Sequence, residues 1–168
     1  YINGAFVDGT SGDRFESRNP ANFDEILGTF PLSSEQDVNN AVSAAKTAYD
    51  GWRRLSRIKR GEHFDEFVQL LKKDREEISR LVTKECGKGI VEGRADVTEG
   101  IHMVQYTFGT VRMPHGDVVD SEIPEKDAFM RRKPKGVVAA ISPWNFPFAI
   151  PLWLICPSVV EGNTVILK

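Results

Sequence analysis

The spacing of apolar residues predicts four helices in the first two thirds of the chain. The first carries a stripe of Val38, Ala41, Val42, Ala45, Tyr49 and Trp52, with Ser33 and Ser34 as candidate N-caps. A second helix is expected from about Arg57, a third ends at Gly87 in the manner of a glycine C-cap, and a fourth runs from about Ile90 to Arg112. Apolar residues recur along the fourth at three- and four-residue spacings, at Val97, Ile101, Val104, Phe108 and Val111. We expect these helices to pack together as a layer.

Short strands are expected before and after this helical layer. Alternating apolar and polar residues predict strands at Tyr1–Val7, Arg14–Arg18 and Glu25–Phe30, because turn residues separate these stretches. From Pro114 to Lys135 the helical period disappears, and short apolar pairs stand among prolines, glycines and charges. This region is predicted to form two exposed strands or an arm.

The last part of the chain has the pattern of a βαβ unit. The continuous apolar run Gly136–Ile141 predicts a buried strand, and the proline-containing stretch Ser142–Pro147 predicts an irregular loop after it. A helix across Phe148–Glu161, broken near Pro157, and a second buried strand at Thr164–Leu167 complete the unit. The connection is long enough for parallel pairing, so the fold class is predicted to be α/β with a parallel sheet.

The loop after the first of these strands places one amide side chain at a strand's carboxyl end. Pro143 and Pro147 fix the backbone on either side of Asn145, which makes the loop rigid and the amide directed. Parallel strands end at the same edge, where open α/β sheets form ligand sites, so Asn145 and Lys168 are expected to face one crevice from strand ends about 5 Å apart. Taken singly, Asn145 is better explained as a turn residue and Lys168 as a solvated lysine. The joint pattern favours a site.

Composition narrows the classes of protein to consider. The 168 residues carry 22 Lys and Arg against 24 Asp and Glu, a net charge of −2, so no overall field favours nucleic acid or an anionic membrane. One domain is the default at this length. Two cysteines and no apolar run near 18 residues point to a cytoplasmic setting. Because the chain starts at Tyr1 and stops at Lys168 directly after an apolar strand, both ends are expected to be cut.

Several other features are better explained as structural. Gly87–Gly93 follows a helix and is one residue too long for a dinucleotide fingerprint. Neither Cys86 nor Cys156 lies in a nucleophile context, so both are expected to be structural thiols. The three histidines, His63, His102 and His115, have no metal-ligand spacing, and no metal is expected. The basic cluster at 131–135 is expected to be a solvated or intersubunit face.

The string Pro143-Trp144-Asn145-Phe146-Pro147, followed by Gly162–Lys168, resembles the aldehyde dehydrogenase superfamily. The resemblance implies the amino-terminal third of such an enzyme, with a partial doubly wound parallel-sheet cofactor domain, an N-terminal helical layer and a β oligomerisation arm. The implied division is cofactor domain at 1–115, arm at 116–134, and the start of the dinucleotide-binding βαβ core at 135–168. One family segment that usually reads Gly-Lys-Pro has Gly89 in the proline position here.

The same resemblance implies an activity and a set of site residues. Asn145 would donate a hydrogen bond to the oxyanion formed when a cysteine attacks the aldehyde, and Lys168 would bind a ribose of NAD or NADP. Ile141, Ser142, Pro143 and Trp144 would line the cofactor groove. From the residues alone, Trp144 and Phe146 could equally be core anchors, and Phe146 is expected to be one. The implied partners are an aldehyde substrate and further copies in a homodimer or homotetramer, with neither nucleic acid nor membrane.

The family's nucleophilic cysteine and general-base glutamate map beyond Lys168, so these 168 residues alone are expected to be inactive. Two alternatives stay open at this point. The first is a non-catalytic nucleotide-binding or structural relative with the same fold. The second is a natural short product that acts as an interaction module.

Overall fold

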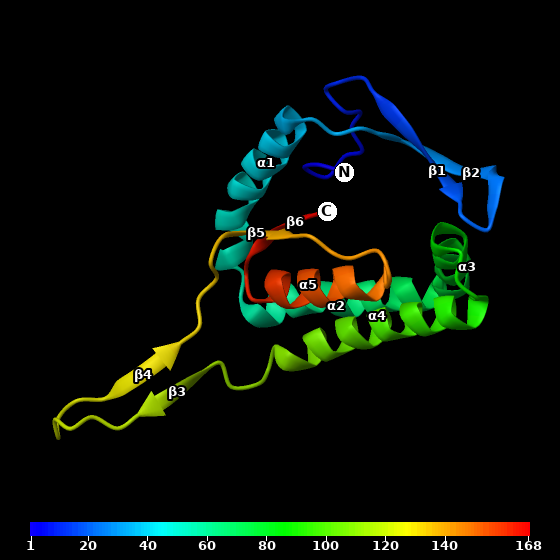
Figure 1. Ribbon diagram of the computed structural model, residues 1–168. Coiled ribbons are helices and arrows are strands. Elements are labelled where there is room, and N and C mark those ends of the chain that lie inside the picture. The colour runs from blue at the N-terminus through cyan, green and yellow to red at the C-terminus, as the bar shows by residue number, and fades with distance from the viewer.

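The helical layer predicted from the sequence is present in the computed structural model, which describes all residues from 1 to 168. The helices are α1 (Glu35–Arg54), α2 (Arg57–Lys73), α3 (Arg75–Cys86), α4 (Ile90–Thr110) and α5 (Ala149–Val160). The strands are β1 (Arg14–Asn19), β2 (Asn22–Pro31), β3 (Gly116–Val119), β4 (Ala128–Arg131), β5 (Val137–Ala140) and β6 (Thr164–Leu167). Figure 1 shows α2, α4 and α5 stacked together, with α3 at one end and the β3–β4 hairpin extending away from them. None of the helices combines the length and the apolar character needed to cross a membrane.

The core lies between α2, α3, α4 and α5. Its buried members include Phe64, Val68, Leu71, Val82, Val97, Ile101, Val104, Val111, Leu152, Cys156 and Val160. The α4 stripe predicted from the sequence is confirmed, since four of its five residues are buried and Phe108 packs against the same cluster. Each fully buried aliphatic side chain contributes about 1.5–3 kcal/mol relative to exposure, so this cluster holds the layer together.

Helix ends follow the capping chemistry expected from the sequence. Ser34 caps α1 in a capping box with Asp37, whose carboxylate also accepts the main-chain N–H of Thr10. These hydrogen bonds, above all the one from the Ser34 main chain, lower the pKa of Asp37. Gly87 ends α3 in the left-handed conformation, at φ 68°, which a residue with a Cβ rarely adopts.

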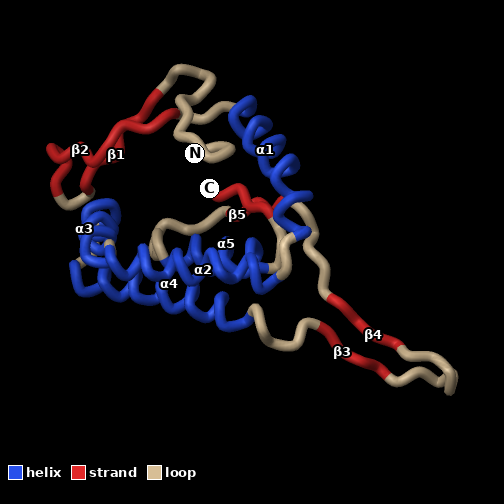
Figure 2. Tube along the Cα trace, turned by 180° about the vertical axis from the view of Figure 1, so that it is seen from behind, coloured by secondary structure: helices blue, strands red, loops and turns tan.

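The parallel βαβ unit is confirmed. Strand β5 pairs with β6 in the register Val137↔Thr164 to Ala140↔Leu167. The two strands lie between α1 and α5 (Figures 1 and 2), where Thr164 Oγ1 donates to the carbonyl of Ala45 in α1 at 3.0 Å. This small sheet therefore has a helix against each of its faces.

The prediction that the last helix breaks near Pro157 is wrong, because α5 continues through it. Leu152, Cys156 and Val160 are buried at intervals of four residues on both sides of the proline. Their packing holds the helix across the missing hydrogen bond, and Pro157 itself is exposed.

The remaining strands form two antiparallel hairpins, β1–β2 and β3–β4. All residues of β3 and β4 are exposed, as expected for the region 114–135. The strand predicted at Tyr1–Val7 is absent: only an isolated bridge joins Ile2 to Ala5. Asn3 and Gly4, both with positive φ, turn the chain back on itself before a strand can form.

Candidate functional site

The loop that carries Asn145 begins at the edge where β5 and β6 both end. The N–H of Lys168 donates to the carbonyl of Ala140 at 2.8 Å, and the N–H of Ser142 donates to the carbonyl of Lys168 at 2.9 Å. These bonds continue the parallel ladder beyond both strands. The main chain at Lys168 therefore lies beside the start of the loop, as predicted for adjacent carboxyl ends.

The side chains predicted to form the site are exposed at this edge. Asn145 and Lys168 are both exposed. Only their main-chain atoms take part in the hydrogen bonds that they make. The side chain of Trp144 is 85% exposed, and Ile141, Ser142 and Pro143 precede it along the same edge with Ser142 half-buried. The structure thus brings the start of the loop and the main chain of Lys168 together, and the side chains of Asn145, Trp144 and Lys168 are exposed to solvent.

Phe146 does not serve as the core anchor expected from the sequence. It is 43% exposed, and the Nζ of Lys88 lies 4.8 Å from the centre of its ring. Phe148 packs against the core in its place. The difference arises because the loop is held against α3 and α4 by polar contacts, which leave the ring of Phe146 beside a cation rather than beneath a helix.

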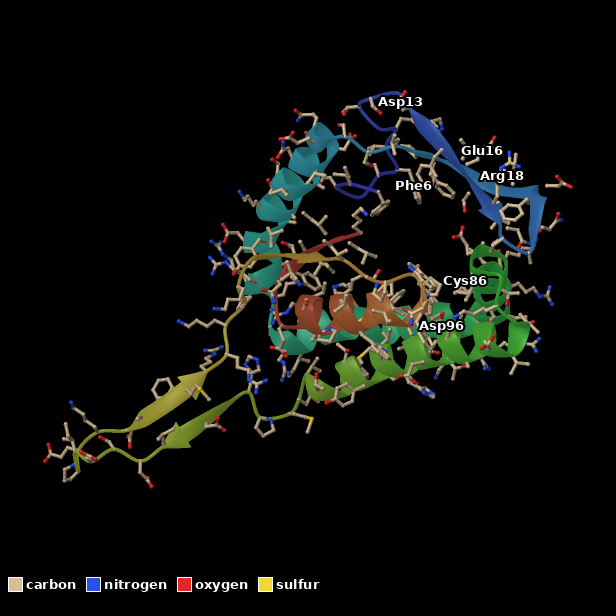
Figure 3. All side chains as sticks on the ribbon, viewed as in Figure 1. Phe6, Asp13, Glu16, Arg18, Cys86 and Asp96 are labelled. Carbon is tan, nitrogen blue, oxygen red and sulfur yellow. The ribbon has the colours of Figure 1, made fainter.

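Three residues that sequence reasoning did not assign to the site hold this loop and the start of α5. Cys86 Sγ lies 3.7 Å from the carbonyl oxygen of Trp144, and Lys88 Nζ donates to the carbonyl of Asn145 at 2.8 Å. Asp96 Oδ1 accepts the main-chain N–H of Ala149 at 2.8 Å. Figure 3 shows Cys86 and Asp96 beside the segment that leads into α5. We call Cys86, Lys88 and Asp96 the corner residues, because they come from the junction of α3 and α4.

Asp96 could have been found from the sequence. It lies one position before Val97 and four before Gly100, on the buried stripe of α4. Asp is almost never fully buried unless it is paired, so an acidic residue on an apolar stripe indicates a partner elsewhere in the fold. The side chain of Asp96 is 0% exposed, and its partner is Lys88, with 3.6 Å between Nζ and Oδ2.

Neither cysteine is suited to act as a nucleophile. Burial raises the pKa of Cys156 to about 12, and it also raises the pKa of Cys86, against a smaller opposing effect of Lys88. Both are free thiols. Since the thiolate is the reactive form, these shifts agree with the expected structural role.

A hollow of about 500 Å³ lies elsewhere, between the start of α2 and the base of the β3–β4 hairpin. It includes Arg57, Met113, His115 and Phe129 and none of the predicted site residues. Next to it, Glu161 pairs with both Arg57 and His115, which ties the hairpin base to the end of α5. This hollow is open, and Arg57 and His115 at it are already paired with Glu161, so the strand edge remains the better candidate site.

Comparisons with known proteins identify the family of the chain. The model of the aldehyde dehydrogenase family matches residues 6–168. An alpha-ketoglutaric semialdehyde dehydrogenase from Bacillus subtilis is 39% identical over 168 residues, covering all of this chain and 34% of the relative. The chain thus spans about a third of that relative's length.

Solved structures give the same result. A betaine aldehyde dehydrogenase from Staphylococcus aureus, in complex with NAD+, superposes with a TM-score of 0.94 at 29% identity, over 100% of this chain and 34% of that one. An NADP-dependent enzyme from E. coli gives the same TM-score and identity over 99% of this chain and 34% of its own. The chain belongs to the aldehyde dehydrogenase family.

Proposed function

We propose that the protein containing these residues oxidises an aldehyde to a carboxylic acid, with NAD or NADP as the hydride acceptor. The observation that carries the proposal is the placement of Asn145 on a proline-flanked loop directly after β5, at the edge where Lys168 follows β6. Relatives named as semialdehyde dehydrogenases and neighbours solved with NAD support the same activity.

In this proposal, Asn145 stabilises the oxyanion that forms when a thiolate adds to the aldehyde carbon. A neutral amide can donate a hydrogen bond to developing negative charge without protonating the nucleophile. Burial raises the pKa of both Cys86 and Cys156, which disfavours either of them as that nucleophile. In this proposal the thiolate comes from another part of the protein, as the family pattern implies.

The cofactor residues in this proposal are Lys168 and the first part of the loop. The exposed Ile141 and Trp144 give apolar surface for a planar ring, and the ammonium of Lys168 can donate to a ribose hydroxyl. Ile141, Trp144 and Lys168 fit a dinucleotide, because they combine apolar surface with a hydrogen-bond donor at a strand edge. When bound, the nicotinamide would accept the hydride.

The β3–β4 hairpin is proposed to be the oligomerisation arm of a homodimer or homotetramer. Val118 and Phe129 are paired across the hairpin, and both are largely exposed. Apolar side chains on a projecting hairpin favour burial against another protein surface. The free thiols favour a reducing, cytoplasmic location for the assembly.

The experiment that tests this function is an assay of the full-length protein with a panel of aldehydes and each dinucleotide. We expect reduced nicotinamide and carboxylic acid to form in equal amounts. Dinucleotide binding without any aldehyde-dependent reduction would contradict the proposal and favour the non-catalytic relative.

A further inference from the structure

Two of the corner residues, Cys86 and Lys88, contact the main-chain carbonyls on either side of the Cα of Asn145. The carbonyl of Trp144 belongs to the peptide plane before the Cα of Asn145, and the carbonyl of Asn145 belongs to the plane after it. Cys86 contacts the first of these carbonyls, and Lys88 donates to the second. Since these two planes set the direction of the Cα–Cβ bond between them, the corner fixes the direction in which the Asn145 side chain leaves the backbone.

The two prolines cannot fix this direction alone. Pro143 and Pro147 restrict their own φ angles, and Pro147 also restricts Phe146 before it, but neither ring fixes the torsions of Trp144 and Asn145. These three residues belong to no helix or strand. The carbonyl of Phe146 accepts the N–H of Ile150 in α5 at 3.2 Å, and the carbonyls of Trp144 and Asn145 are contacted from the corner. Of the two corner contacts, the thiol contact is the weaker, because an S–H donor at 3.7 Å makes a weak hydrogen bond. The hydrogen bond from Lys88 is therefore the stronger of the two restraints on the peptide planes beside Asn145.

Lys88 is held in place in turn. It lies between Gly87, which ends α3, and Gly89, the N-cap of α4, so its backbone belongs to a short connection between two packed helices. Its side chain is only 16% exposed and lies against the buried Asp96. Asp96 Oδ2 makes no hydrogen bond and lies 3.6 Å from the ammonium of Lys88. Asp96 Oδ1 accepts the N–H at the start of α5. The ammonium and the helix N-terminus together balance the buried negative charge of Asp96.

We propose that Lys88 is a positioning residue for Asn145, with Asp96 holding its ammonium in place, so that the α3–α4 corner sets the orientation of the oxyanion-donating amide. This inference rests on the proposed role of Asn145 in aldehyde oxidation. Neither Lys88 nor Asp96 touches the reacting atoms in this account, because both act through the main chain of the loop.

A double-mutant cycle in the full-length enzyme tests the proposal. Lys88→Met keeps the aliphatic stem and removes the ammonium, and it is combined with Asn145→Ala. We expect Lys88→Met alone to lower kcat by about 10- to 100-fold, because small misplacements of a catalytic group have effects of that size. In the Asn145→Ala background it should lower kcat no further, within about a factor of two. Dinucleotide affinity should stay the same in both backgrounds.

The matched control is Lys59→Met, which removes an exposed ammonium paired with Glu62 on α2 and should leave kcat unchanged. Two kinetic results would overturn the positioning role. One is a Lys88→Met enzyme as active as the control, and the other is an equal fall in kcat with or without the Asn145 amide.

Removing Lys88 alone leaves Asp96 buried without its counter-charge, which can unfold the protein. The variant Lys88→Met/Asp96→Asn removes both charges and separates the two effects. We expect it to regain the unfolding temperature lost by Lys88→Met while kcat stays low. Recovery of kcat along with stability would show that the pair is only structural and would overturn the proposal.

A crystal structure of the Lys88→Met/Asp96→Asn variant tests the positioning role without relying on the reaction. We expect the Asn145 amide to move by about 1 Å or more from its parental position, the scale at which catalytic geometry is lost. An unmoved loop would overturn the positioning role even if Asn145→Ala is nearly inactive. If Asn145→Ala keeps its kcat, the oxyanion role fails, and the crystal structure alone then accepts or rejects the positioning role.

Discussion

The main-chain N–H of Ser142 donates a 2.9 Å hydrogen bond to the carbonyl oxygen of Lys168. Two residues that are 26 positions apart in the sequence thus meet at the edge of the β5–β6 pair, one opening the loop and the other following the last strand. The bond involves only main-chain atoms. Substitution of the Lys168 side chain therefore leaves the edge intact and isolates the contribution of the ammonium.

Lys168→Ala in the full-length enzyme should weaken dinucleotide binding. A hydrogen bond to a charged group is worth about 1.5–3 kcal/mol, which corresponds to a loss of affinity of about 10- to 150-fold. Titration of the dinucleotide by fluorescence measures it, with Lys59→Met as the control. Unchanged affinity would return Lys168 to the role of a solvated lysine.

Gly100→Ala should destabilise the fold, because α4 and α5 approach closely at this residue. A Cβ at Gly100 would lie 2.6 Å from Cδ1 of Phe148 and 2.9 Å from Cδ1 of Leu152. Overpacking of this kind costs about 1–3 kcal/mol. The free energy of unfolding of the full-length enzyme, measured in denaturant, should fall by that amount.

The control for Gly100 is Gly51→Ala, since a Cβ at Gly51 meets nothing within 4 Å. This change should stabilise α1 by about 0.5–1 kcal/mol, the intrinsic preference of a helix for alanine. Equal effects of the two substitutions would contradict the close approach.

The two cysteines should differ in reactivity. Cys156 is buried and has a pKa of about 12, whereas Cys86 is half-buried and its pKa is raised less. Iodoacetamide at about pH 8, followed by peptide mass spectrometry, should therefore label Cys86 first. In guanidinium chloride the two rates should become equal. Faster labelling of Cys156 in the folded protein would contradict the packing of α5.

The raised pKa of Cys156 also predicts a dependence of stability on pH. The folded value of about 12 lies above the unfolded value of about 8.5. The contribution is therefore fully present below the unfolded pKa and is lost as the pH rises towards 12. Cys156→Ala should lose less stability than the parent across this interval in denaturant titrations, and an identical loss would argue against burial of the thiol.

The 168 residues expressed alone should self-associate and show no aldehyde oxidation. Ile141, Trp144 and Leu167 are exposed around the β5–β6 edge, and Val118 and Phe129 are exposed on the hairpin. Apolar surface beside a strand edge promotes association. Size-exclusion chromatography with light scattering and an aldehyde assay measure both properties. A monomer that reduces NAD with an aldehyde would contradict this prediction.

The helices could be predicted because local rules determine them. Ser34 begins α1 and Gly87 ends α3 through capping chemistry that depends on neighbouring residues, and the α4 stripe repeats with the helical period. The parallel pairing of β5 and β6 followed from the length of the connection between them. These features need no knowledge of distant contacts.

The sequence-based predictions were wrong where distant contacts or an unusual backbone conformation determine the local structure. The continuation of α5 through Pro157 depends on packing against α2 and α4, and the turn at Asn3 depends on a positive φ that alternation does not reveal. Cys86 and Lys88 were missed because the groups that they contact in the loop are main-chain atoms more than 50 positions away. A motif describes side chains, so it does not identify what holds the backbone that carries them.

The kcat of Asn145→Ala in the full-length enzyme is the most direct test of the proposed function. Loss of one preorganised oxyanion donor should lower kcat by about 100- to 1000-fold. Dinucleotide affinity should hardly change, because the substitution leaves Lys168 and the start of the loop in place. A variant that keeps more than about half of the parental kcat, with the chemical step rate-limiting, would contradict the account.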